Sequence, residues 1–295
     1  MTAPNTLAEL EARVDRALTT GDESELEVLG YGEISCVLAS HDGDQALAAK
    51  RLPLFDTSAR FEAYREAFES YIERLSATGV RVLPSSLEST PAADGRIAGW
   101  CRQPLLEPGT LAPTWLGNAN KEKARWLLEG IAEQIFTTVG PHLGLDGQLS
   151  NWAVVDGGLS YFDVTTPMMR DEMGRDVLDI DLFVASMPWA LRGPVRRFAL
   201  RAILDTYYRP RQVLVDLLGN FVKEGVTAWL PAGLEVVNDI AEPAIDEAEV
   251  RTYYRQDARM YAVLQRLRRI DRAWQRKVRR RPYAFLLPGK VERHV

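Results

Sequence analysis

Residues 146–163 read Asp146-Gly-Gln-Leu-Ser-Asn151-Trp-Ala-Val-Val-Asp-Gly-Gly-Leu-Ser-Tyr-Phe-Asp163. Two apolar, β-prone stretches, 152–155 and 159–162, flank residues of the Asp-Gly-Gly type that favours a tight hairpin turn. If the two stretches pair, Asn151 before the hairpin and Asp163 after it emerge at the same end of the ribbon. Asp146, on the loop that leads in, can then lie nearby.

Three oxygen-bearing side chains with this spacing can converge on one metal ion. Mg²⁺ binds through one or two carboxylate or carbonyl oxygens and takes its other ligands from water and substrate phosphates. Asn151 and Asp163 are therefore the predicted metal ligands, and Asp146 is left to orient a hydroxyl group and accept its proton during phosphoryl transfer. The alternative is structural: Asp146 and Asn151 cap turns, and Asp163 ends a strand.

The composition is that of a globular chain, with 295 residues, 46% of them hydrophobic and 26% charged. This length allows one large domain or two lobes. The formal net charge of −5 argues against a nucleic-acid-binding surface over the whole protein. The charge is uneven, because residues 266–281 contain nine Lys or Arg and one Asp, a local +8 that leaves −13 elsewhere.

The basic segment carries Leu267, Ile270 and Trp274 at helical spacing. One interpretation is a terminal helix that packs these side chains on the body of the protein and leaves its charges in water. The other is an anionic partner at Arg266–Arg281, either a membrane surface or a polyanion, with a phosphorylated substrate as a further candidate.

Cys36 and Cys101 are the only cysteines, and both fall in predicted strands. We expect buried, reduced thiols rather than a disulfide or a metal site. The N-terminus lacks the basic-then-apolar plan of a signal peptide, and no run of 18 apolar residues occurs. We therefore expect a cytoplasmic protein.

The N-terminal part begins with a helix and continues with strands. A capping box at Thr6-x-x-Glu9 opens the helix, and strands are predicted at 26–29, 36–40 and 46–51. The turn between the first two strands reads Gly30-Tyr-Gly32-Glu-Ile-Ser35. It lets backbone N–H groups approach phosphates, or it simply makes a turn. A strand follows it, whereas a dinucleotide-binding glycine motif opens a helix.

Lys50 lies near the end of the third predicted strand, in Ala-Leu-Ala-Ala-Lys-Arg. It can reach nucleotide phosphates there, or it can mark a solvated edge. An amphipathic helix is predicted over residues 57–76, with Tyr64 and Phe68 in its apolar stripe. Glu69 is the acid closest to this stripe on a helical wheel and is the candidate to pair with Lys50.

The remaining pattern divides the chain into lobes. Strands are predicted at 80–83 and 96–103, around a polar loop at 84–95, and helix signals dominate after residues 103–110. Helices are predicted at 120–138, 177–191, 194–208, 212–224 and 246–277. The predicted organisation is α+β, with an N-terminal helix at 1–24, an antiparallel-sheet lobe at 25–104 and a mostly helical lobe at 105–295.

The order of these features resembles the protein-kinase-like superfamily, in particular its small-molecule branch of aminoglycoside- and choline-phosphotransferase-like enzymes. The resemblance covers residues 25–185. It implies a bilobal fold, the cofactors ATP and Mg²⁺, and transfer of the γ-phosphoryl group to a hydroxyl of an unidentified small acceptor. It also implies a nucleotide loop at Gly30, Gly32 and Ser35, phosphate contacts at Lys50 held by Glu69 or a neighbouring Glu, adenine contacts at Gln103 and Leu105, catalysis at Asp146, and metal binding at Asn151 and Asp163.

Several positions depart from the family pattern. His142 lies four residues before Asp146, so the family's His or Arg directly before the aspartate is absent, and Ser35 replaces the third glycine. Val-Thr-Thr follows Asp163 where protein kinases have Phe-Gly, which disfavours a regulated protein kinase. A pseudokinase scaffold, a kinase that acts on a protein or peptide, and nucleotidyl transfer remain alternatives. Asp179 or Asp181 is a candidate to brace the catalytic loop.

Overall fold

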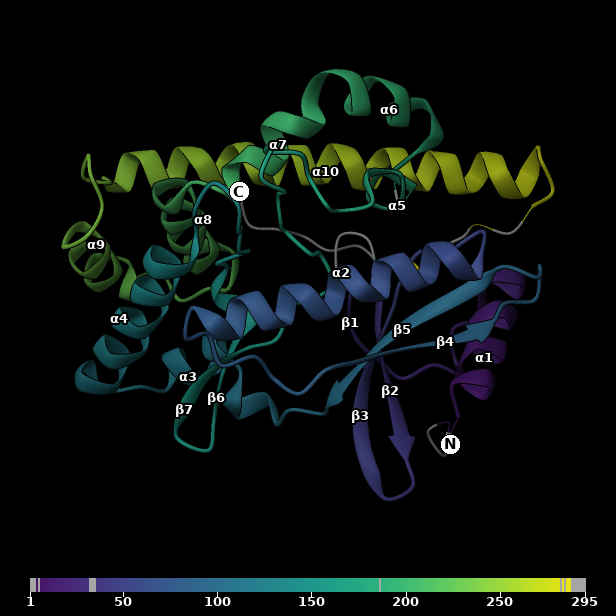
Figure 1. The fold of residues 1–295 in the computed structure, drawn as a ribbon, viewed down its shortest axis with the longest axis horizontal. Coiled ribbons are helices and arrows are strands. Elements are labelled where there is room, and N and C mark those ends of the chain that lie inside the picture. The colour runs from purple at the N-terminus through teal and green to yellow at the C-terminus, as the bar shows by residue number, and fades with distance from the viewer. Residues whose placement is uncertain are drawn as a thin grey trace.

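The computed structural model describes residues 4, 6–31, 36–185, 187–281, 283 and 285–287, so Gly32 and Ser35 of the predicted nucleotide loop lie outside the described residues. A five-stranded antiparallel sheet forms the N-terminal part, and a mostly helical part follows it (Figure 1). The predicted α+β class is confirmed.

The sheet has the strand order β1-β2-β3-β5-β4. Its strands are β1 (Val28–Tyr31), β2 (Cys36–Asp42), β3 (Gln45–Arg51), β4 (Ser86–Pro91) and β5 (Ile97–Pro104). Lys50 lies on β3, the central strand, opposite Val37 of β2 and Cys101 of β5. A solvated sheet edge is therefore not the setting of Lys50.

The prediction of a strand at 80–83 and a loop at 84–95 is wrong, because β4 occupies residues 86–91. Val82 makes only an isolated bridge, to Tyr161. β4 is an edge strand with polar residues and a terminal Pro91, and edge strands are often built this way to resist further pairing. Its sequence therefore resembles a loop.

Helices cover both faces of the sheet. Helix α1 (Leu7–Thr20) packs Leu10 and Val14 against Trp100 and the neighbouring strands. Helix α2 (Ser58–Ala77) packs its buried stripe on the other side, in the core that contains Cys101. Lys50 and Cys101 are directly opposed in adjacent strands, so Lys50 shares the α2 face.

The helical part contains one hairpin and eight helices in the described residues. They are α3 (Ala112–Gly117), α4 (Lys121–Thr138), β6 (Trp152–Val155), β7 (Gly158–Tyr161), α5 (Ile180–Ala185), α6 (Trp189–Pro194), α7 (Leu200–Thr206), α8 (Pro210–Lys223), α9 (Leu230–Asn238) and α10 (Glu247–Lys277). Short turns of other helix types lie at Pro108–Thr110, Leu149–Asn151, Val195–Ala199 and Thr227–Trp229. The helix predicted at 177–191 is interrupted at Pro188, the one predicted at 194–208 is continuous with α6 and passes through the π-helical turn at Val195–Ala199, and α9 was not predicted.

The last helix, α10, runs along the length of the molecule (Figure 1). It has 31 residues, which corresponds to about 45 Å at 1.5 Å per residue. Tyr253 near its start bonds Asp216 of α8 at 3.0 Å, and Arg276 near its end donates to the carbonyl of Leu18 in α1 at 2.8 Å. α10 therefore ties the helical part to the N-terminal helix.

Cys36 and Cys101 are buried free thiols, as predicted. None of the helices in the described ranges combines the length and apolar character that crossing a membrane requires.

Candidate functional site

The hairpin of residues 152–161 forms as predicted. Its register pairs Trp152 with Tyr161, and Asp156 and Gly157 turn the chain with φ of 50° and 72°. Two positive φ values are typical of the two-residue turn that matches strand twist. Beyond the paired strands, the N–H of Phe162 donates to the carbonyl of Asn151 at 3.1 Å. Asn151 and Asp163 therefore emerge at the same end of the ribbon.

Lys50 and Asp163 form an ion pair across the two parts of the molecule. Lys50 Nζ lies 2.7 Å from Asp163 Oδ1, and the two side chains are 20% and 25% exposed. The hydroxyl of Thr165 donates to the same oxygen at 3.2 Å. Burial, the largest effect, raises the pKa of Asp163, but Lys50 and Thr165 together outweigh it and hold the pKa below its ordinary value. Asp163 is thus an ionised carboxylate at neutral pH.

Glu69 does not hold Lys50, and this expectation is corrected. Glu69 is exposed on α2, and the carboxylate beside Lys50 is that of Asp163. Four of the five buried side chains of α2 are aromatic. Tyr64 donates its hydroxyl to the carbonyl of Thr165 at 2.5 Å, and Tyr71 donates to the carbonyl of Gly144 at 3.0 Å.

Burial raises the pKa of both Tyr64 and Tyr71, which keeps the two hydroxyls protonated as donors. They fix the backbone on either side of the site, just after Asp163 and just before Asp146. The spacing of seven residues within the apolar stripe of α2 indicated two core aromatics. This periodicity predicts that the two rings are buried, but it does not predict the hydrogen bonds that their hydroxyl groups donate.

Gln103, one of the predicted adenine contacts, supports the end of the hairpin. Its Nε2 donates to the carbonyl of Phe162 at 2.7 Å and to the hydroxyl of Ser85 at 2.8 Å. Leu105 is exposed, and its N–H donates to the carbonyl of Ala46 on β3. The last residues of β5 therefore lie between β3 and the residue before Asp163.

Asp146 and Asn151 are joined within one loop. The N–H of Gln148 donates to Asp146 Oδ1 at 3.2 Å, and Asn151 Nδ2 donates to the carbonyl of Asp146 at 3.2 Å. These contacts agree with the turn-capping alternative for both residues. They also leave the amide oxygen of Asn151 without a hydrogen bond inside the described part of the chain.

Helix α8 braces this loop, which the sequence did not predict. Asn220 is buried, accepts from the N–H of Ser150 at 3.1 Å and donates to Gln148 Oε1 at 3.2 Å. Lys223 donates to the same oxygen at 3.0 Å. A buried asparagine in the middle of a helix is the one sequence signal that could have drawn attention to this contact.

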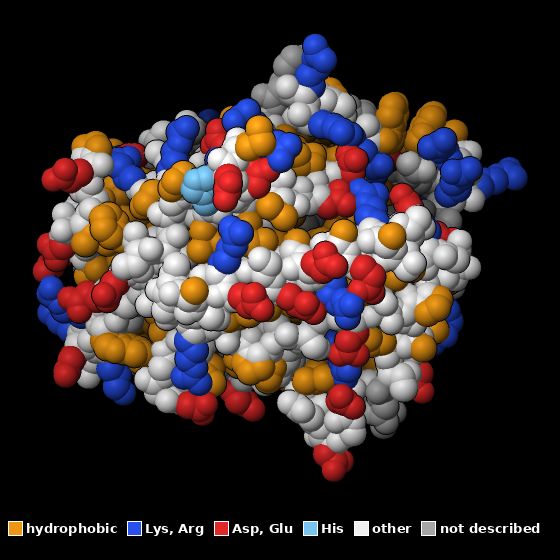
Figure 2. Space-filling view, viewed as in Figure 1, with side chains coloured by type: hydrophobic (Ala, Val, Ile, Leu, Met, Phe, Trp, Pro, Cys, Tyr) orange, Lys and Arg blue, Asp and Glu red, His pale blue; other side chains and the backbone are white. Residues whose placement is uncertain are grey.

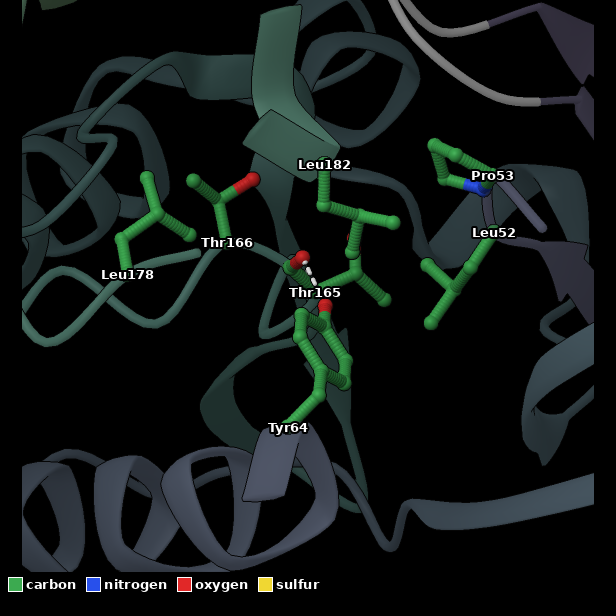
Figure 3. Close-up of a pocket in the computed structure, with 7 residues that line it drawn as sticks. All are labelled: Leu52, Pro53, Tyr64, Thr165, Thr166, Leu178 and Leu182. Carbon is green, nitrogen blue, oxygen red and sulfur yellow. Dashed lines mark hydrogen bonds between the residues drawn. The ribbon is translucent and has the colours of Figure 1, made fainter. Parts of the chain in front are cut away.

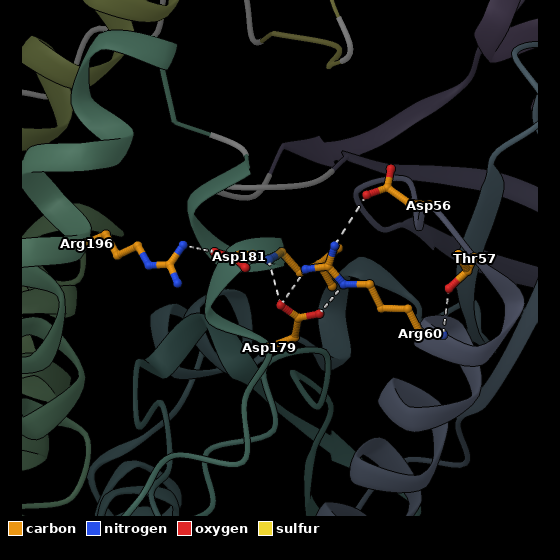
Figure 4. A network of polar contacts seen from close by, with 7 residues as sticks. Asp56, Thr57, Arg60, Asp179, Asp181 and Arg196 are labelled. Atoms are coloured by element: carbon orange, nitrogen blue, oxygen red, sulfur yellow. Dashed lines mark hydrogen bonds and ion pairs between the residues drawn. The ribbon is translucent and has the colours of Figure 1, made fainter.

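Asp179 and Asp181, the predicted braces, contact other groups (Figure 4). Asp179 receives both Nε and Nη2 of Arg60 on α2, at 2.6 and 2.7 Å. Asp181 pairs with Arg196. His142 is exposed, and its Nδ1 lies 3.0 Å from the carbonyl of Asp171.

A small pocket lies beside the Asp163 loop (Figure 3). It is lined by Leu52, Pro53, Tyr64, Thr165, Thr166, Leu178 and Leu182. The hydrogen bond from Tyr64 to Thr165 forms part of its wall, so the pocket and the ion pair share one support.

The oxygen groups suited to binding a hard cation are the Asp163 carboxylate and the Asn151 amide oxygen. They are oxygen ligands on the two strand ends of one hairpin, and Mg²⁺ needs few protein ligands when phosphates and water supply the others. Among the described residues, no group of three or more His, Cys, Asp or Glu side chains converges as a self-sufficient metal site. The two-ligand arrangement fits a metal that arrives with a nucleotide.

Comparison of the sequence with models of protein families finds one match. A family model described as "Family of unknown function (DUF6206)" matches residues 9–272. The chain belongs to this family. No curated protein matches the sequence. Among solved structures, the chain is similar to "WaaP in complex with acyl carrier protein", with 14% identity and a TM-score of 0.42 over 88% of this chain and 98% of that one.

Proposed function

We propose that the protein is an ATP-dependent phosphotransferase that moves the γ-phosphoryl group of Mg·ATP to a hydroxyl of a small acceptor. The observation that carries the proposal is the 2.7 Å contact between Lys50 and Asp163, which are 113 residues apart. The pair brings an ammonium group of the sheet and an ionised carboxylate of the hairpin to one point. A Mg·ATP site requires these two groups together, the cation for the phosphates and the carboxylate for the metal.

In this proposal each side chain has one task. Lys50 attracts the α- and β-phosphates, Asn151 and Asp163 hold the metal, and Asp146 orients the acceptor hydroxyl and accepts its proton. The nucleotide loop at residues 30–35 and the segment from Gln103 to Leu105 contact the rest of the nucleotide. When bound, Mg²⁺ would offset the negative charge of the phosphates.

Four side chains position these groups by holding the backbone around them. Tyr64 and Gln103 hold the backbone on the two sides of Asp163, and Tyr71 and Asn220 hold the loop that contains Asp146. Phosphoryl transfer requires little covalent chemistry from the protein, so accurate positioning supplies much of the rate.

A nucleotide-binding scaffold without turnover is the second candidate. The observation that favours it is the role of Asp146 as a turn cap, through Oδ1 and the N–H of Gln148. In addition, the residue before Asp146 is the buried Leu145 rather than a basic side chain.

The substitution Asp146→Asn distinguishes the two candidates. We expect ADP formation from Mg·ATP to fall by about 10²- to 10⁴-fold, because the proton acceptor is lost, while stabilisation by Mg·ATP is retained. The matched control is Asp44→Asn in the β2–β3 turn, which is exposed and should leave turnover unchanged. Wild-type protein that binds Mg·ATP without any turnover, or an Asp146→Asn variant as active as wild type, would overturn the proposal.

A further inference from the structure

The solvent-facing side of α10 carries a stripe of large apolar side chains. Their exposed fractions lie between 47% and 60%, and they are Met260, Val263, Ile270 and Trp274, with Val278 at the C-terminal cap of the helix. The spacings of three, seven, four and four residues place all five on one face of a helix. A surface helix normally directs such a stripe toward the core.

The core-facing side of α10 is already occupied by other residues. Val250, Tyr254, Ala258 and Arg268 are buried on that side. The bonds from Tyr253 to Asp216 and from Arg276 to the carbonyl of Leu18 tie the two ends of α10 to the body. The exposed stripe is therefore not the side of α10 that packs on the body. It is a second apolar face of the same helix.

Positive charge borders this stripe along one side and at its C-terminal end. From Arg259 to Arg281 the chain has ten Lys or Arg and a single acid, Asp271, which is buried. The exposed cations are Arg259, Arg266, Lys277, Arg279, Arg280 and Arg281. Figure 2 shows hydrophobic side chains next to a group of Lys and Arg side chains at the side of the molecule where α10 runs in Figure 1.

We propose that this face of α10 is a docking surface for an anionic lipid bilayer, on which the helix lies parallel to the membrane plane. Apolar side chains on one face with cations beside them match the two layers of such a membrane surface, the acyl boundary and the negative headgroups. The net −13 of the residues outside 266–281 would turn the rest of the protein away from that surface.

Charge and side-chain chemistry disfavour two other occupants. A second copy would bring the same cationic helix against α10, and like charges repel. The phosphates of a nucleic acid could pair with the arginines, but a phosphate backbone offers no apolar surface to Met260, Val263 and Ile270. The proposal does not depend on the phosphotransferase proposal, because it involves none of the residues of that site.

Co-sedimentation of the full chain with lipid vesicles tests the proposal. We expect binding to phosphatidylcholine vesicles that contain phosphatidylglycerol, little binding to phosphatidylcholine alone, and weaker binding as salt is raised. Arg266→Gln with Lys277→Gln should weaken binding by about 30-fold, since each basic residue near an anionic surface contributes about 1 kcal/mol, or roughly fivefold. Ile270→Ser with Trp274→Ser should weaken it on the order of tenfold, because apolar insertion is lost.

The matched control combines Trp126→Ser with Lys121→Gln. Both control residues are exposed on α4, and Trp126 is about as exposed as Trp274, at 44% against 47%. The control should bind as wild type does, and urea unfolding of each variant shows that the fold is retained. Three results would each overturn the proposal: no binding of the wild type to the anionic vesicles, equal binding by the Ile270/Trp274 variant, or binding to a DNA duplex but not to vesicles at the same salt.

Discussion

Asp216 is a carboxylic acid held between two helices, next to the loop of the candidate site. The hydroxyl of Tyr253 on α10 donates to Asp216 Oδ1 at 3.0 Å. Burial, the largest effect, and the charge of Asp257 raise the pKa of Asp216 to about 6, although hydrogen bonds from Tyr253 and Gln148 oppose the rise. Asp216 therefore links the α8 brace to α10 with a group that titrates near neutrality.

The raised pKa makes stability depend on pH. The ordinary pKa of 3.8 applies to the unfolded chain, so between about pH 4 and pH 6 the folded protein binds more protons than the unfolded one. The free energy of unfolding therefore falls as pH rises through this window, and the charged carboxylate lowers stability at neutral pH. Asn can still accept the bond from Tyr253 without that charge.

We predict that Asp216→Asn raises the free energy of unfolding by about 1 to 3 kcal/mol at about pH 7, and that the difference disappears near pH 4. Urea unfolding at the two pH values measures it. Asp239→Asn, an exposed position at the end of α9, is the control and should change little at either pH. A destabilised Asp216→Asn at neutral pH would show that the carboxylate is needed in its charged form.

At the scale of elements, polar contacts from three side chains within helix α2 hold it to the helical part. Arg60 makes a two-bond ion pair with Asp179, and Asp179 also accepts the N–H of Leu182 in α5 at 3.1 Å. The Arg60 guanidinium, opposed by burial, holds the pKa of Asp179 below its ordinary value. With the hydroxyls of Tyr64 and Tyr71, this pair sets the position of α2 over the candidate site.

We predict that Arg60→Ala lowers the free energy of unfolding by about 1 to 2 kcal/mol, because a partly buried bidentate pair is lost and Asp179 keeps its charge. Arg65→Ala on the same helix is the control. Arg65 pairs with Glu62 on an exposed face, so its loss should cost less than about 0.5 kcal/mol. Equal losses for the two variants would mean that the Arg60–Asp179 pair is not a special contact of α2.

The elements that could be predicted are those whose signals are local. The hairpin at 152–161 carries its own turn residues, and α10 carries its own cap, since the side chain of Asp246 accepts the N–H of Glu249 at 2.8 Å. The partner of Lys50 is not local. Which residue pairs with Lys50 depends on the distance between α2 and β3, and the helical wheel that selected Glu69 gives no information about that distance. Asn220 was missed for the same reason, because its partners lie 70 residues away.

At the scale of the whole molecule, the sheet and the helical part are joined at the site itself. Lys50 on β3 meets Asp163, and Gln103 on β5 meets the carbonyl of Phe162. The order of features along the chain could predict that these segments approach each other. It could not predict the side chains that complete the contact, because these follow from the packing of α2 and α8.

We predict that Mg·ATP binds where Lys50 and Asp163 meet. The most direct measurement is the free energy of unfolding with and without Mg·ATP, compared for wild type, Asp163→Asn and Asp156→Asn. Asp156, at the turn of the same hairpin, is exposed and adopts a positive φ that Asn tolerates, so it is the matched control.

With Mg·ATP at 100 times its dissociation constant, wild type and Asp156→Asn should each gain about 2.7 kcal/mol, and Asp163→Asn should gain almost nothing at the same concentration. An absent gain in the wild type, or an undiminished gain in Asp163→Asn, would contradict the account.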